Sequence, residues 1–330
     1  MEGSGSVPTP SRAGASSSPS SYPIMRATGG SRTIQSRSVE SVLRTFSTKA
    51  DPSVAPEATR ALPCPLCGSS RSGKPWKAEG VTFTRCVGCG LRRQDPQPMP
   101  EVVVARYGDG YLAYETARHI EYRSIALQSL GEAGLHPDNA VAPGASRPSM
   151  LEIGCATGAL LSAFAQAGWA VTGVEAGHSM AAYARKSFGL DVIAGTIETA
   201  ALPPQAFDAV VATHLIEHLN DPRSFLRETR RVMRNDGRLY LVTPNVDGLQ
   251  ARLMASKWRS AIRDHLYLFS ARTLRALLAS EGFSVEYLGT WGGWPAGMRP
   301  VAIKKTVDSA AKRLGWGDVM VLRSKLETPA

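Results

Sequence analysis

The nine residues MLEIGCATG, Met150 to Gly158, decide the fold of this chain of 330 residues. They form an apolar strand that runs into a glycine turn, and the pattern after them predicts a helix over 159–167 that ends at Gly168. Residues 169–174 form a second apolar strand, which Glu175 follows. Strand, turn, helix and strand make one βαβ unit, so we expect a mainly parallel α/β sheet with a ligand crevice at the carboxyl ends of its strands.

The residues of this turn favour a nucleoside cofactor that carries no pyrophosphate. Glycines let a backbone approach a ligand closely, and Glu175, 21 positions after Gly154, is placed to accept two hydrogen bonds from a ribose diol. A dinucleotide fold requires G-x-G-x-x-G, whereas Cys155 and Ala156 stand after the first glycine here. Glu152 would repel a pyrophosphate but tolerates a cation, so S-adenosylmethionine, with its sulfonium and ammonium groups, fits better.

Later segments supply the rest of the sheet. The sequence Asn220-Asp221-Pro222 is a helix-start signal, and Gly237 is expected to end that helix. A further helix is expected over 273–280. The short apolar run 207–212 predicts a strand, and further strands are expected at 238–243, 284–289 and 318–324.

The chain resembles the class I S-adenosylmethionine-dependent methyltransferases from about Ser149 to Phe283, and most of all their ubiquinone-biosynthesis and small-molecule group. The matching segments are LEIGCATG (151–158), VTGVEAG (171–177), LPPQAFDAVVATHLIEHLNDP (202–222), FLRETRRVMRNDGRLYLVTPN (225–245) and HLYLFSARTLRALLASEGF (265–283). The resemblance implies a Rossmann-like sheet of seven strands with helices on both faces and a terminal pair of hairpin strands.

The resemblance also implies the cofactor contacts. Glu175 would bind the ribose hydroxyls, Met180 would lie over the adenine, and His214 would line the pocket. Many relatives carry an Asp after the third strand, where this chain reads Ala194-Gly195-Thr196-Ile197-Glu198, so the adenine amine would meet the backbone at Thr196 and Ile197, or Glu198. The residues around the methionine part would be Glu152, Gly154, Cys155 and Gly158.

A histidine motif, His214-Leu215-Ile216-Glu217-His218, follows the fourth strand. Its H-x-x-E-H spacing is that of a class of zinc peptidases, but those carry it on a long helix, which argues against a peptidase. The Glu–His pair resembles that of ubiquinone-biosynthesis O-methyltransferases, where a carboxylate three residues earlier joins a divalent-metal site. That position is His214 here. A metal at His214, Glu217 and His218 and a purely bracing role for Glu217 and His218 both stay open.

His265 opens the segment HLYLFS after a loop, 245–265, that we expect to cap the substrate crevice. His218 and His265 are the candidate catalytic residues, because an imidazole titrates near neutrality and can take a proton from a hydroxyl. A capping or packing role for His265 is the alternative. Methyl transfer depends more on alignment than on acid–base chemistry, so a weak base suffices.

Three tyrosines precede the core. Tyr107, Tyr111 and Tyr114 have the spacing of one helical face within a helical segment over 98–130. That face either forms a lid over the site or packs on the core.

Two C-x2-C pairs lie nearer the N-terminus. Cys64 and Cys67 form the first pair, and Cys86 and Cys89 form the second after an 18-residue spacer. Two pairs at this separation favour a closed tetrahedral zinc site in a ribbon, with one strand over 81–85. Unrelated free thiols and a redox pair fit the pattern less well, so the predicted metal ligands are these four cysteines and their role is structural.

The net charge of +10 lies at the two ends of the sequence. The net charge is +3 over 1–60, +4 over 61–97 and +4 over 299–330, whereas 98–298 carries −1. A broad polyanion-binding face on the core is therefore not expected, and nucleic acid is an unlikely partner. No apolar run is long enough to span a bilayer.

Residues 1–60 contain 14 serines and few apolar residues, which predicts a disordered leader. The stretch 34–48 is rich in Arg and Ser and resembles a mitochondrial transit peptide; an ordinary leader or a translation start at Met25 is the alternative. We therefore expect a cytoplasmic protein, with a mitochondrial location as the alternative. The expected organisation is a leader over 1–60, a zinc ribbon over 61–97, a helical lead-in over 98–147 and a methyltransferase domain over 148–330.

Together these features predict a methyltransferase that moves a methyl group from S-adenosylmethionine to a small molecule, most readily to an oxygen of a sugar, lipid-linked or natural-product intermediate. One alternative is an RNA methyltransferase that grips its substrate with the ribbon. Another is a binding module that keeps the fold without turnover. The sequence leaves the acceptor and the oligomeric state open.

Overall fold

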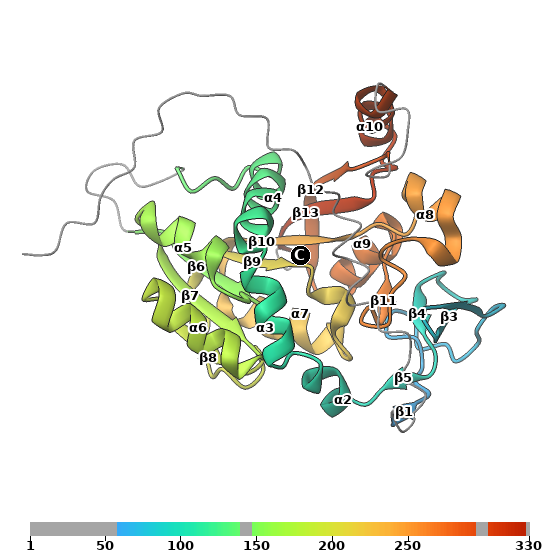
Figure 1. Cartoon of the computed structure of the whole chain (residues 1–330), viewed down its shortest axis with the longest axis horizontal. Coiled ribbons are helices and arrows are strands. Elements are labelled where there is room, and N and C mark those ends of the chain that lie inside the picture. The colour runs from blue at the N-terminus through green and yellow to red at the C-terminus, as the bar shows by residue number, and fades with distance from the viewer. Residues whose placement is uncertain (1–57, 139–146, 295–302, 328–330) are drawn as a thin grey trace, which may run out of the picture. The chain divides into compact units, whose positions relative to one another are not determined.

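A computed structural model describes residues 58–138, 147–294 and 303–327 (Figure 1). The predicted transit-like stretch and the start at Met25 lie outside these residues. The leader was predicted to reach residue 60, but its last two residues form strand β1 (Thr59–Arg60), which pairs with β5 (Gln97–Pro98). No helix in the described ranges is long and apolar enough to cross a membrane.

The main sheet has seven strands in the order β12-β13-β10-β9-β6-β7-β8. Neighbours from β10 to β8 are parallel, and β13 runs antiparallel to both β10 and β12. This confirms the predicted seven-stranded, mainly parallel sheet. The strands are β6 (Ser149–Ile153), β7 (Ala170–Glu175), β8 (Val192–Ala194), β9 (Phe207–Thr213), β10 (Met233–Pro244), β12 (Phe283–Trp291) and β13 (Val319–Leu326).

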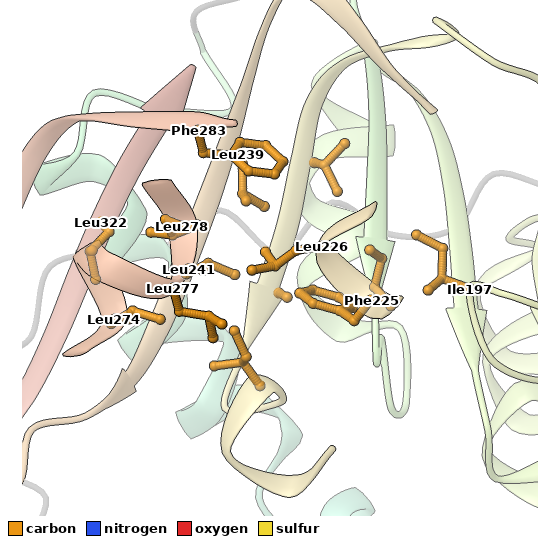
Figure 2. Packing of buried hydrophobic residues seen from close by; sticks show 14 of the residues in the cluster. Ile197, Phe225, Leu226, Leu239, Leu241, Leu274, Leu277, Leu278, Phe283 and Leu322 are labelled. Carbon is orange, nitrogen blue, oxygen red and sulfur yellow. The ribbon is translucent and has the colours of Figure 1, made fainter. Parts of the chain in front are cut away.

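Side chains alternate between two buried faces along these strands, because successive residues of a strand point in opposite directions. On one face Leu239, Leu241 and Leu322 meet α7 and α9, and Figure 2 shows Phe225, Leu226, Leu274, Leu277 and Leu278 turned toward the sheet. On the other face Tyr240, Val242 and Val321 join a cluster with α4, α5 and α6. The described helices are α2 (Pro100–Ala105), α3 (Asp109–Thr116), α4 (His119–Glu132), α5 (Ala159–Gln166), α6 (His178–Phe188), α7 (Pro222–Val232), α8 (Leu249–Met254), α9 (Ala271–Ser280) and α10 (Lys304–Arg313), with 3-10 turns η1 (Ile216–His218) and η2 (Ala255–Lys257).

Helix α7 begins where the sequence predicted and ends earlier. The Asp221 carboxylate accepts hydrogen bonds from Arg223 N and Ser224 N, both at 3.0 Å, and Pro222 fits the first turn because its missing N–H has no helical partner there. The predicted end at Gly237 is wrong. The chain turns into β10 at Met233, which pairs with Phe207 ahead of a bulge before Arg238, so strand pairing replaces the last helical turn.

The lead-in is three short helices, and the prediction of one helical segment over 98–130 is wrong in this respect. Tyr107 lies between α2 and α3, because the chain breaks at Gly108, whose extended backbone begins α3. A second break at Arg118 separates α3 from α4.

The four-cysteine segment forms a small antiparallel sheet. Its strands are β2 (Trp76–Ala78), β3 (Val81–Arg85) and β4 (Arg92–Gln94), and β3 confirms the strand predicted over 81–85. A fourth strand, β11 (Tyr267–Leu268), belongs to the C-terminal part of the chain and pairs with β4 (Figure 1). The predicted cap loop over 245–265 contains α8 and η2.

Candidate functional site

Two glycines in the turn after β6 adopt the left-handed backbone conformation. Gly154 has φ +72° and Gly158 has φ +76°, and Gly154 N donates to Val174 O at 2.8 Å. A Cβ on Gly158 would lie 2.7 Å from Leu190 Cδ1, and one on Gly154 would lie 3.1 Å from Leu215 Cδ1. Both positions therefore favour glycine for its φ, and at Gly158 the close approach of Leu190 adds a limit on space.

Glu175 links this turn to the end of β7. Its Oε1 accepts from Gly177 N at 2.7 Å and its Oε2 from Ala156 N at 2.9 Å, and only 5% of the residue is exposed. Burial raises the pKa of the carboxyl, and these two backbone donors oppose that effect. A carboxylate has about four acceptor positions, so two remain for the hydroxyls of a diol.

Glu152 and Cys155 lie beneath the turn. One oxygen of Glu152 accepts from the Leu161 N–H in the first turn of α5, while Oε2 has no partner among the described residues. Burial, with a smaller contribution from Glu175, raises the pKa of Glu152 to about 8. Burial also raises the pKa of the Cys155 thiol, whose Sγ would lie 2.8 Å from a Cβ on Gly173. The carboxyls of Glu152 and Glu175 lie at one turn, and one oxygen of Glu152 has no partner among the described residues. This arrangement suits a cationic ligand such as S-adenosylmethionine.

The residues predicted around the adenine lie beyond β7 and β8. Met180 is buried in α6, and its Cε would lie 3.0 Å from a Cβ on Gly177, beside the turn that binds Glu175. Ile197 is buried in the core cluster. Thr196 is exposed, but its N–H donates to Thr199 Oγ1 at 3.0 Å.

A second cluster lies beyond the carboxyl end of β9. One ligand atom each from Glu217, His218 and His265 lies within 4.8 Å of the others. Nδ1 of His218 is 3.0 Å from Asp264 O, Nδ1 of His265 is 2.8 Å from Ser260 O, and the two rings meet edge to face at 4.7 Å. Because a carbonyl oxygen only accepts, each Nδ1 carries the proton and each Nε2 keeps a free lone pair.

The Glu217 carboxylate is held from both sides. Thr243 Oγ1 donates to Oε2 at 2.9 Å, and His214 Nδ1 lies 3.2 Å from Oε1. Burial alone would raise the pKa of Glu217, but the hydrogen bond of His214 and the charges of the surrounding histidines lower it to about 2. Burial lowers the pKa of His265 to about 3 and also lowers that of His218. Near neutral pH the cluster is a carboxylate beside two neutral imidazoles.

The structure changes the donor set that the sequence indicated for a divalent metal. The sequence grouped His214 with Glu217 and His218, whereas the structure groups His265 with them. His214 has φ +51° and a side chain that is 46% exposed, and it contacts the outer oxygen of Glu217. A carboxylate and two free imidazole nitrogens fit a divalent cation, because backbone carbonyls already orient both rings.

The three tyrosines are brought together although no single helix carries them. Tyr107 meets His218 edge-on at 6.4 Å and Tyr111 at 5.2 Å, and Tyr111 stacks on Tyr114 at 6.2 Å. Burial raises the pKa of Tyr107 and of Tyr111. The carbonyl oxygen of Tyr107 would lie 3.2 Å from a Cβ on Gly177. The tyrosines therefore connect the turn at Glu175 to the histidine cluster.

The four cysteines converge in the ribbon. Cys64 Sγ lies 3.5 Å from Cys89 Sγ, Cys67 Sγ lies 3.4 Å from Cys86 Sγ, and all four sulfurs lie within 4.8 Å of one another. Four thiolates around one Zn²⁺ would be about 3.8 Å apart, so the residues fit that ion. Burial raises the pKa of Cys86, but N–H groups of Cys89 and Gly88, with Cys67, lower it to about 6.

Two residues of the site were not identified from the sequence. Thr243 is fully buried and bonds Glu217, and a lone hydroxyl near the carboxyl end of the apolar strand β10 was the signal for it. Gln94 is 2% exposed and reaches the backbone beside His265. Gln94 carried no signal, because its partner lies 171 positions away.

Comparison with known proteins agrees with this geometry. Residues 128–288 match a family model described as a methyltransferase domain. A ubiquinone biosynthesis O-methyltransferase of Pseudomonas entomophila is 34% identical over 102 residues, which are 29% of this chain and 44% of the relative. A protein of the same name from Klebsiella pneumoniae is 32% identical over 112 residues, which are 32% of this chain and 46% of the relative.

This chain spans less than half the length of these curated relatives. Among solved structures, the complex that contains the Trm112 methyltransferase activator of Haloferax volcanii includes a chain with TM-score 0.50 and 15% identity. The match covers 67% of this chain and 96% of that one, and at this identity it shows the fold alone. The family match, the curated relatives and the fold together support a class I S-adenosylmethionine-dependent methyltransferase domain over residues 128–288.

Proposed function

We propose that this protein transfers a methyl group from S-adenosylmethionine to a hydroxyl oxygen of a small molecule. The observation that carries the proposal is the meeting, at the carboxyl ends of neighbouring strands, of the glycine turn with Glu175 and of the Glu217–His218–His265 cluster. Tyr107 contacts His218 and approaches Gly177, so the two groups belong to one site. The O-methyltransferase names of the relatives support oxygen as the acceptor atom.

Each part of the site has a role in this proposal. S-adenosylmethionine, when bound, supplies a methyl group on a sulfonium carbon. Glu175 holds the ribose hydroxyls, and Glu152 with the glycine turn faces the cationic end. His218 takes the hydroxyl proton at Nε2, because its ring is less buried than that of His265 and its Nδ1 proton is held by Asp264 O. His265 and Glu217 orient His218.

A divalent cation at Glu217, His218 and His265 is a second arrangement that the donor set supports. Such an ion would supply Lewis acidity to the acceptor hydroxyl. Glu217 would then be held for the ion by Thr243 and His214. The two arrangements differ once divalent ions have been removed and zinc has been returned to the cysteine site, because only the second then needs Mg²⁺ or Mn²⁺ to regain turnover.

We propose Zn²⁺ for the four-cysteine site, in a structural role, because four sulfur ligands leave no open coordination position. The near-neutral central segment supports a small-molecule acceptor over RNA. An RNA substrate would instead give binding that weakens steeply with salt.

Calorimetric titration with S-adenosylmethionine tests the cofactor site. We expect binding by the wild type and its loss in Glu175→Ala, which removes the diol acceptor, and in Gly154→Arg, which fills the turn. Glu101→Ala, in the exposed first turn of α2, is the control. Binding that is unaltered in both site variants would remove the cofactor assignment, and a screen of hydroxyl acceptors by mass then tests the acceptor atom.

A further inference from the structure

The ribbon and the histidine cluster share a β-sheet. Strand β4 of the ribbon pairs with β11, which begins two residues after His265, with Arg93 opposite Tyr267. The pairing continues past the strand ends, because Gln94 N donates to Leu266 O at 2.8 Å. The backbone that follows His265 is therefore part of the ribbon sheet.

The side chain of Gln94 makes the contact closest to the site. It is 2% exposed, and its Nε2 donates to Arg263 O at 2.6 Å and to His265 O at 3.0 Å. The amide thus uses both of its N–H groups on the turn that carries His265. Leu266 N in turn donates to Glu217 O at 2.8 Å, which connects this backbone to the rest of the cluster.

The cysteine site is fastened to the same structure. The chain passes from the second cysteine pair directly into β4, where Cys86 N donates to Leu91 O at 2.8 Å. From the core, Arg272 donates to Cys89 O at 2.6 Å. On the other face of the ribbon Phe83 is buried in one cluster with Trp258 of the cap segment. A shift of the cysteine pair would be transmitted to β4.

We infer that the ribbon is a wall of the acceptor site, and that Gln94 is the positioning residue that fixes His265 and, through it, His218. The inference rests on the proposed function only in giving the cluster its catalytic role. An intact cysteine site fixes the start of β4, and β4 pairs with β11. The side chain of Gln94 fixes the 263–265 turn by its two hydrogen bonds. In that turn Asp264 O binds Nδ1 of His218, and His265 itself places its Nδ1 on Ser260 O, which lies just before the turn.

The ring tautomers of the histidines follow from this arrangement. A neutral imidazole in water prefers the proton on Nε2, and here two backbone carbonyls hold it on Nδ1. If the turn relaxes, Asp264 O moves away from His218 and the ring of His265 moves away from Ser260 O, so the proton returns to Nε2 in both rings. This change removes the lone pair that His218 offers to the acceptor hydroxyl. Loss of Gln94 therefore changes which nitrogen carries the proton, a change that lowered stability alone would not produce.

Nitrogen NMR of protein labelled at its six histidines tests the inference. The wild type is expected to show the rings of His218 and His265 neutral and protonated at Nδ1. Gln94→Met, which keeps the volume and removes both donors, is expected to show a mixture of tautomers at these two rings. Gln166→Met, at the exposed end of α5, is the control and is expected to match the wild type.

Amide hydrogen exchange gives a second measurement on the same proteins. Loss of two hydrogen bonds predicts exchange about 30-fold faster over 262–268 in Gln94→Met, with the 150–158 turn unchanged. Zinc removal by a chelator is expected to act on the same segment. If Gln94→Met does not fold, Gln94→Asn, which is too short to reach both carbonyls, takes its place.

Unchanged tautomers together with unchanged exchange over 262–268 would overturn the inference. These readouts need no acceptor and no turnover. A protein that fails to bind S-adenosylmethionine but shows the tautomer change would refute the proposed function and leave the inference standing.

Discussion

Replacing Glu152 by glutamine should make the unfolding free energy less dependent on pH. The Glu152 carboxyl is buried, one of its oxygens has no partner among the described residues, and burial raises its pKa from 4.5 to about 8. The folded protein therefore keeps a proton on Glu152 that the unfolded chain releases above pH 4.5. Since the folded state binds more protons between these two values, this residue's contribution to stability falls as pH rises from about 4.5 to 8.

The magnitude follows from the two pKa values. The wild type loses about 1 kcal/mol through this carboxyl at pH 5, about 3 kcal/mol at pH 7 and nearly 5 kcal/mol at pH 9. The amide of the Glu152→Gln variant cannot ionise, and its carbonyl can still accept from the Leu161 N–H. At pH 5 this variant should thus unfold at about the same urea concentration as the wild type. At pH 9 it should unfold at a clearly higher urea concentration than the wild type.

Urea unfolding from pH 5 to 9, followed by circular dichroism without cofactor, measures this difference. Glu101→Gln, at the exposed start of α2, serves as the control and should parallel the wild type. Parallel curves for wild type and Glu152→Gln across the whole range would show that Glu152 is ionised in the folded protein and would refute the reasoning.

Three further predictions concern the turn and the ribbon. Gly158→Ala should lower the unfolding free energy by about 2–4 kcal/mol in urea titration, because it adds a left-handed alanine at φ +76° and a Cβ 2.7 Å from Leu190 Cδ1. Ala156→Gly should raise the unfolding free energy by about 1 kcal/mol, because Ala156 already has φ +47°; a destabilised variant would contradict the strain argument. Metal analysis should find one zinc per chain and none in Cys64→Ser/Cys86→Ser, whose melting temperature should also fall.

The strand and turn residues were predictable because their signals are local. A short apolar run marked β9, and Asp221-Pro222 marked the start of α7, since both signals depend on neighbours in sequence. The end of α7 was missed because the pairing of Met233 with Phe207, a partner 26 positions away, decided it. The single helix expected for the tyrosines failed at Gly108, where the chain breaks although the spacing continues.

The sequence by itself determined the class of the sheet, the glycine turn with Glu175, and the four cysteines that converge, because each signal lies within one short segment, 25 positions long for the cysteines. Only the tertiary structure decided that His265 joins Glu217 and His218, that His214 stays outside, and that Gln94 of the ribbon holds the turn of His265. Those contacts join segments up to 171 positions apart. Their geometry depends on how β4, β9 and β11 pack together, and no local sequence pattern predicts this packing.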